Sequence, residues 1–104
     1  VASTSQDLAQ GLMYRHALDH YDGMLFDFSS PKKVAMWMKN TALPLDMIFI
    51  SPDLTINHIA HNTSPYSEQV IASEHFSRYV LELSAGSAKQ MNLAIGDQLL
   101  LEQP

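Results

Sequence analysis

Short apolar runs separated by polar turns recur along the chain. Such runs predict strands where Pro, Gly, Asp or Ser bounds them, because these residues terminate strands and form turns. Two of the runs, residues 34–38 and 47–50, are largely apolar on both faces, which predicts strands covered on both sides. The expected strands are residues 24–28, 34–38, 47–50, 55–61, a short strand near 70–71, 79–83 and 98–102.

Two short helices are expected among these strands. Residues 4–7 have the form of a capping box, and Leu8 and Leu12 are four apart on one helical face, so the sequence predicts a helix over residues 5–15. Ser87 is expected to cap a second helix that ends near residue 92 or 93. The polar stretch 29–31 should close the first strand.

The order of these elements predicts a fold class. Strands with short connections and no alternation of strand and helix indicate a mainly β protein: an antiparallel β-sandwich or jelly-roll-like barrel with one or two short peripheral helices. The 104 residues suit a single domain spanning residues 1–104. Val1 and Ala2 look like the end of a strand, so we expect that most of a first strand, and any signal peptide, lies upstream of this chain.

Composition excludes several classes of function. The formal net charge is −5, from eleven acidic and six basic residues, and Lys32 and Lys33 are the only adjacent pair, so no basic face for nucleic acid is expected. No apolar run approaches the roughly 20 residues that a membrane-spanning helix needs. The chain has no cysteine, which excludes thiol catalysis, thiolate metal sites and disulfides.

The five histidines and six methionines give no pattern for a metal site. His58 and His61 are three apart on an expected strand and so point to opposite faces. We therefore expect no metal and no cofactor.

An unusually polar turn lies between the apolar runs near residues 36–50. Lys39, Asn40, Thr41 and Asp46 surround Pro44, although a hairpin turn requires only Gly, Asn or Pro. Their excess of polar groups suggests a ligand pocket, in which a few polar groups stand in an apolar lining. The residues expected to contact the ligand are Arg15, Trp37, Lys39, Asn40, Thr41 and Asp46.

Each of these residues has a role in that pocket. Arg15 and Lys39 would hold an anionic or hydroxyl-rich ligand. Asn40 and Thr41 would give directional hydrogen bonds, and Trp37 would be an apolar wall.

The same groups could instead satisfy one another. In that interpretation Asp46 accepts hydrogen bonds from the backbone of Asn40 and Thr41 and fixes the turn. Arg15 ties the first helix to the sheet through a carboxylate.

Four segments together resemble the prokaryotic family called domain of unknown function 192 (DUF192). They are residues 11–15, 23–26, 37–46 with its Trp-Met-Lys-Asn-Thr and Pro-Leu-Asp motifs, and 81–86 followed by Gly96 and Asp97. The resemblance implies a compact β-sandwich of jelly-roll character with short helices at its edge. It implies a frequent origin as an exported or envelope protein, with a periplasmic location if so and a cytoplasmic one otherwise. It implies no established activity.

Three functions stay open on the sequence. The first is a non-enzymatic binding or accessory envelope domain, with a small anion or a carbohydrate held near the Trp37–Asp46 turn. The second is a hydrolase-like enzyme in which Asp46 or Glu82 is the general base and Arg15 or Lys39 stabilises developing negative charge. The third is a protein-interaction module whose partner the sequence does not identify.

Overall fold

The computed structural model describes residues 23–99, which form a four-stranded sheet, a two-stranded sheet and one short helix. The larger sheet has the order β1 (Gly23–Lys32), β6 (Ser77–Ser84), β3 (Leu45–Ile50), β4 (Ile56–Ala60), and every pair in it is antiparallel. The smaller sheet pairs β2 (Ala35–Met36) with β5 (Ile71–Ala72). The helix α2 covers Ser87–Gln90. The predicted helix over residues 5–15 lies outside the described residues.

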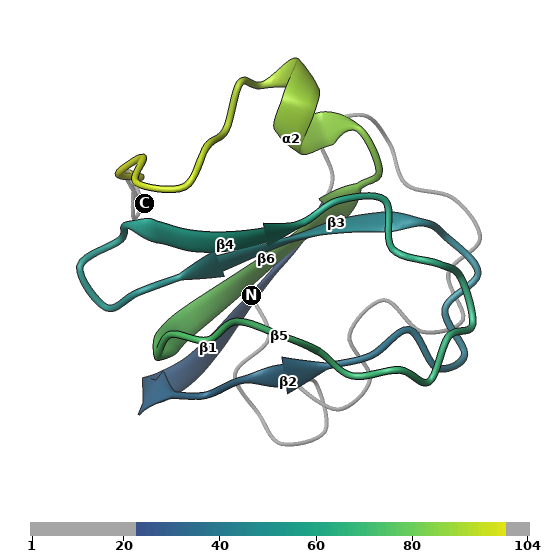
Figure 1. Ribbon diagram of the computed structural model, residues 1–104, viewed down its shortest axis with the longest axis horizontal. Coiled ribbons are helices and arrows are strands. Elements are labelled where there is room, and N and C mark those ends of the chain that lie inside the picture. The colour runs from purple at the N-terminus through teal and green to yellow at the C-terminus, as the bar shows by residue number, and fades with distance from the viewer. Residues whose placement is uncertain (1–22, 100–104) are drawn as a thin grey trace.

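The larger sheet is covered on both faces. Figure 1 shows the β2–β5 pair on one side of it and α2 with the segment that follows on the other. On the first side, Val34 and Met38 pack with Phe26, Met47 and Val80. On the second side, Ile48, Ile50 and Ile56 pack with Ala88, and Leu93 and Leu99 join them. The sheet therefore separates two apolar cores.

Strand β3 has both faces buried, as the sequence predicted. All six of its residues are buried, and alternate positions contribute to the two cores: Met47 and Phe49 to one, Ile48 and Ile50 to the other. The same prediction was wrong for residues 34–38. There the alternation leaves Val34 and Met38 buried but exposes Ala35, Trp37 and Lys39, because β2 lies at the outside of the fold.

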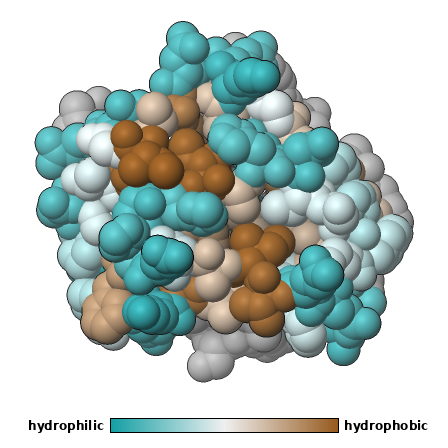
Figure 2. All heavy atoms as spheres, in the orientation of Figure 1, coloured by the Kyte–Doolittle hydropathy of each residue, from teal (hydrophilic) through white to brown (hydrophobic). Residues whose placement is uncertain are grey.

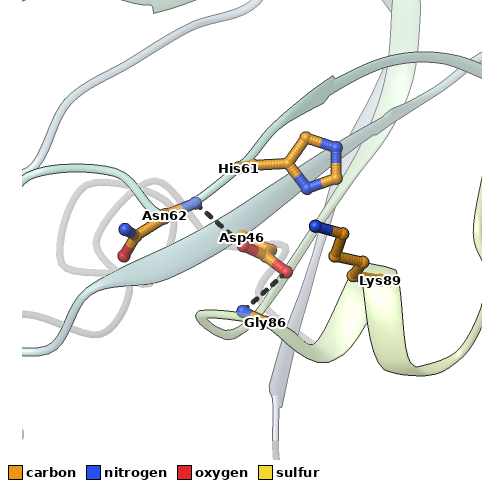
Figure 3. Close-up of a pocket in the computed structure, with 5 residues that line it drawn as sticks. All are labelled: Asp46, His61, Asn62, Gly86 and Lys89. Carbon is orange, nitrogen blue, oxygen red and sulfur yellow. Dashed lines mark hydrogen bonds between the residues drawn. The ribbon is translucent and has the colours of Figure 1, made fainter.

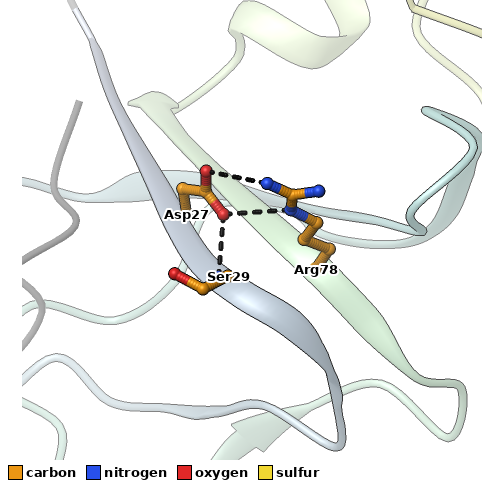
Figure 4. A network of polar contacts seen from close by, with 3 residues as sticks. All are labelled: Asp27, Ser29 and Arg78. Atoms are coloured by element: carbon orange, nitrogen blue, oxygen red, sulfur yellow. Dashed lines mark hydrogen bonds and ion pairs between the residues drawn. The ribbon is translucent and has the colours of Figure 1, made fainter.

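Strand β1 runs through the polar stretch that was expected to end it. Its pairing with β6 shifts register between Asp27 and Lys32, and Ser29 has a positive φ of 70°. Figure 4 shows how this irregularity is held: Asp27 accepts a hydrogen bond from the Ser29 backbone at 2.8 Å and pairs with Arg78 of β6 at 3.2 Å. The Arg78 guanidinium lowers the pKa of Asp27 chiefly through this hydrogen bond. The Asp27 side chain, two residues before Ser29, thus links the irregular part of β1 to its partner strand β6.

The start of α2 differs from the prediction. Ser87 is the first residue of the helix, not its cap; Gly86 is the N-cap, with φ of 92°, and no side chain of its own segment caps the helix. A carboxylate from a distant strand takes this role, as described below. The sequence could not show this, because a cap from outside the segment leaves no local pattern.

The fold class is confirmed at its coarser level. The described residues are mainly β, the sheets are antiparallel, and the strands do not close into a barrel. The sandwich or jelly-roll description stays a prediction. Of the last expected strand, residues 98–102, the structure describes Gln98 and Leu99, and Gln98 forms a bridge with Thr55. In residues 23–99, no helix has the length and hydropathy needed to cross a membrane.

Candidate functional site

Asp46 is a fully buried carboxylate whose oxygens accept three backbone hydrogen bonds. It lies on β3, fully buried, on the same face as Ile48 and opposite Leu83 of β6, so its carboxylate points toward α2. One oxygen, Oδ1, accepts from the Asn62 backbone N–H at 2.9 Å. The other, Oδ2, accepts from the Gly86 and Ala88 backbone N–H groups at 3.1 and 2.9 Å. A buried carboxylate is stable when backbone donors compensate its lost hydration.

The carboxylate of Asp46 joins two left-handed corners of the backbone. Asn62 follows β4 with φ of 48°, and Gly86 follows β6 with φ of 92°. Asn and Gly are the residues that adopt this conformation most readily. The sequence supplies one of them at each corner, and Asp46 holds both corners by their N–H groups. This corrects the expected pairing of Asp46 with the backbone of Asn40 and Thr41.

A cavity of about 360 Å³ lies between these corners, lined by Asp46, His61, Asn62, Gly86 and Lys89. Figure 3 shows the Lys89 side chain reaching from α2 toward His61 and the Asp46 carboxylate. His61 and Lys89 are exposed, whereas Asp46 is closed to solvent. The ammonium of Lys89 and the imidazole of His61 are therefore the side-chain groups that a small molecule in this cavity would meet.

No carboxylate of residues 23–99 lies within ion-pair distance of the Lys89 ammonium. The ion pair formed within these residues joins Arg78 and Asp27. The charge of Asp46 is balanced locally by three backbone dipoles. The cavity thus offers the side-chain donors of Lys89 and His61 at its rim. At its floor lies the Asp46 carboxylate, whose oxygens already accept three hydrogen bonds.

The other predicted contact residues lie elsewhere. Lys39 stands over the Trp37 ring at 5.1 Å, and Trp37, 43% exposed, lines a separate hollow of about 230 Å³ with Val70, Ala35 and Met36. Thr41 is buried, and its hydroxyl donates to the Lys39 carbonyl at 3.1 Å. The structure thus brings Trp37, Lys39 and Thr41 near one turn but separates them from the Asp46 cavity.

Asn40 and Arg15 are the two remaining predicted contact residues. Asn40 occupies the turn with φ of 58° and is exposed, and it already makes an interaction of its own. Arg15 lies outside the described residues. The proposed ligand roles of all these residues stay predictions.

The chain matches the sequence profile of DUF192, described as an uncharacterized ACR, over residues 1–101. The chain belongs to the DUF192 family. The earlier resemblance is thereby confirmed, and the family's function is not established. No curated protein matches this DUF192 chain.

Two solved structures are similar to the DUF192 chain. One is a Sinorhizobium meliloti protein described as a candidate transcription regulator, with 48% identity and a TM-score of 0.91 over 93% of this chain and 75% of the other. The second is a protein of unknown function from Novosphingobium aromaticivorans, with 37% identity and a TM-score of 0.90 over 93% of this chain and 69% of the other.

Glu82 is a second buried carboxyl of the DUF192 chain, on the opposite face of the sheet. It pairs across the strands with Met24 and Met47 and is 4% exposed, so it faces the core that contains Met47 and Val80. Its Oε1 has no hydrogen-bond partner among residues 23–99. Burial raises the pKa of Glu82 to about 7. Glu82 is thus closed to solvent, and it forms no ion pair with Lys39, which lies over the Trp37 ring.

These surroundings leave neither carboxyl suited to general-base catalysis. A general base must reach a substrate proton from an accessible position. The oxygens of Asp46 are held by backbone donors in a closed position, and Glu82 faces apolar side chains. Residues 23–99 also contain no group of three metal-ligating side chains.

Sequence reasoning identified Asp46 but missed His61, Asn62, Gly86 and Lys89 as its neighbours in the DUF192 chain. Asn62 and Gly86 each follow an expected strand, which marks a possible left-handed corner. Nothing in the local sequence indicates that both corners meet Asp46.

Proposed function

We propose that this domain binds a small polar molecule in the Asp46 cavity and does not transform it. One observation carries the proposal: a cavity of about 360 Å³ whose two walls are fixed to one buried carboxylate, with the Lys89 ammonium and the His61 imidazole at its rim. Ligand sites are concave and place a few convergent polar groups on a fixed frame. The hydrogen bonds of Asp46 provide that frame.

Binding is favoured over catalysis by the state of the two buried carboxyls. The hydrolase hypothesis needs Asp46 or Glu82 open to a cleft and close to a cation. Asp46 is fully buried and its oxygens accept from three backbone N–H groups, and Glu82 faces the core that contains Met47. The proposal therefore assigns Asp46 a structural role in the site.

A surface for a protein partner is less well supported. On the face seen in Figure 2, hydrophobic side chains gather in separate patches divided by hydrophilic ones. Docking surfaces are usually contiguous apolar areas. The ligand-binding role of Trp37, which lines the small hollow, and of Lys39 beside it stays a prediction.

The cellular setting is part of the proposal. A binding domain in the envelope suits the origin that the family resemblance implies. A binding domain also suits the Sinorhizobium meliloti relative described as a candidate transcription regulator, since a regulator needs a part that senses a signal. Direct contact with nucleic acid is not proposed, because the chain carries a net charge of −5.

The test is a thermal-shift screen against organic acids, sugars, nucleotides and phosphate, with a variant in which the cavity is filled. His61→Trp places a large ring in the cavity from an exposed position, and His75→Trp is the matched control on an exposed loop outside it. A ligand at a hundredfold excess over its dissociation constant stabilises the folded state by about 2.7 kcal/mol. We expect a stabilising compound whose effect disappears in His61→Trp and persists in His75→Trp. A compound that stabilises all three proteins equally would contradict the proposal.

A further inference from the structure

We propose that the ligand of the Asp46 cavity carries a carboxylate, which binds between the Lys89 ammonium and the His61 imidazole. This inference rests on the proposed function and names the chemistry of its ligand. Lys89 comes from α2 and His61 from the end of β4, and both side chains face the cavity in Figure 3. An anion between them would receive hydrogen bonds from both walls.

Lys89 differs from Arg78, Lys32 and Lys39 in the environment of its charge. Arg78 is paired with Asp27, and Lys32 and Lys39 lie over the rings of Phe28 and Trp37 at 5.7 and 5.1 Å. The Lys89 ammonium has no carboxylate of residues 23–99 in ion-pair range and stands at the rim of a cavity. A cation so placed can hold the carboxylate of a ligand through charge-assisted hydrogen bonds.

The backbone donors of the site decide between a carboxylate and a phosphate. Phosphate sites commonly use several backbone N–H groups of a loop or helix start. Here the N–H groups of Asn62, Gly86 and Ala88 are all occupied by Asp46. Two side-chain donors remain at the rim, and two donors match the two oxygens of a carboxylate.

The cavity is large enough for a small acid. Its volume of about 360 Å³ lies at the lower end of the range of about 300–1,000 Å³ for small-molecule sites. A di- or tricarboxylic acid fits this volume. A second carboxylate of such an acid would extend toward solvent past the exposed side chains of His61 and Lys89.

Isothermal titration calorimetry with citrate, malonate, inorganic phosphate and glucose tests this inference. Lys89→Met removes the charge but keeps the aliphatic stem, and Lys33→Met is the control that removes the same charge from an exposed position outside the cavity. We expect citrate or malonate to bind, with Lys89→Met weakening binding about tenfold or more and Lys33→Met leaving it within about twofold. His61→Ala should weaken binding in the same direction.

Three results would overturn the inference. Tighter binding of phosphate than of both acids would show that the anion held by the cavity is not a carboxylate. Glucose binding that Lys89→Met leaves unchanged would reject the carboxylate while the proposed function stands. Absence of binding by all four compounds would reject the carboxylate, and the broader screen with His61→Trp would then decide the proposed function separately. Circular dichroism melting of each variant confirms that it is folded.

Discussion

At the scale of single residues, Asp46 carries more of the site than any other described side chain. Its three backbone partners lie in the segment after β4 and at the start of α2, 16 to 42 residues away in the sequence. A neutral amide at this position would turn an N–H donor toward at least one backbone N–H. We expect Asp46→Asn to lower the free energy of unfolding by roughly 2–4 kcal/mol, because hydrogen bonds to charged groups contribute about 1.5–3 kcal/mol each.

Urea denaturation followed by circular dichroism measures this effect. Glu74→Gln, which neutralises an exposed acid, is the charge-matched control and should change the free energy of unfolding by less than about 0.5 kcal/mol. An Asp46→Asn variant as stable as Glu74→Gln would show that the two corners do not depend on the carboxylate.

Glu82 predicts a dependence of stability on pH. Burial raises its pKa to about 7, so the folded state holds its proton more tightly than the unfolded state does. Its contribution is fully present below the unfolded pKa of about 4.3 and is lost as the pH rises to about 7. Roughly 3–4 kcal/mol of stability is lost over this window, at 1.36 kcal/mol per pKa unit.

The difference between wild type and Glu82→Gln isolates this contribution, because Asp27 and the other carboxyls titrate equally in both. Urea denaturation at pH 5 and pH 8 should show the wild type losing stability relative to Glu82→Gln at the higher pH. Parallel pH profiles for the two proteins would mean that Glu82 ionises freely in the folded state.

At the scale of elements, α2 starts from Gly86, where the cost of the backbone conformation can be measured apart from steric contacts of an added side chain. Gly86 has φ of 92°, and an added Cβ would meet nothing within 4 Å. Any cost of a side chain there is therefore conformational. We expect Gly86→Ala to lower the free energy of unfolding by about 1–2 kcal/mol and Gly86→Asn by less, because Asn tolerates the left-handed region better. Thermal or urea denaturation measures both, and equal stability of Ala and Gly at this position would refute the argument.

The elements also show what local pattern can and cannot predict. The apolar run at residues 47–50 predicted β3 and its burial on both faces, because both cores take side chains from it. The equally apolar run at 34–38 predicted the same and was wrong, since its outward face carries Trp37, which is 43% exposed with Lys39 over its ring. Apolar composition alone does not distinguish a central strand from an outer one.

The cap of α2 illustrates a second limit. Ser87 has the local chemistry of a cap, yet a carboxylate from β3 forms the bonds. Polar residues near a turn indicate that polar contacts will form, but the partners depend on how the strands are arranged. The sequence therefore identified Asp46 as significant and assigned it the wrong partners.

At the scale of the whole molecule, the four-stranded sheet lies between two cores, and β3 takes part in both. Met47 and Ile48 are adjacent, each fully buried, and belong to opposite cores. We expect Met47→Ala and Ile48→Ala each to lower the free energy of unfolding by about 2–5 kcal/mol, the usual cost of a cavity in a packed core. Denaturation curves measure both, and a cost below about 1 kcal/mol for either would show that its face of the sheet is open.

The site as a whole was only partly predictable for the same reason. Asp46 follows from its place in the polar turn beside an apolar run and from the family motif that it belongs to. His61 follows β4, and Lys89 lies on α2, which follows β6. The strand order β6-β3-β4 places these two segments on either side of Asp46. Only the folded arrangement brings them to one cavity, and it leaves Trp37 and Lys39 outside that cavity.

The most direct test of the central claim is an NMR titration of isotope-labelled protein with citrate. The amide protons of Asn62, Gly86 and Ala88 report on the cavity, because each is hydrogen-bonded to the Asp46 carboxylate at its floor. We predict that these three resonances shift together and saturate at one dissociation constant, with the Trp37 resonances unaffected. Saturable shifts at Trp37 and Val70, with Asn62, Gly86 and Ala88 unchanged, would place the binding site elsewhere and contradict the account.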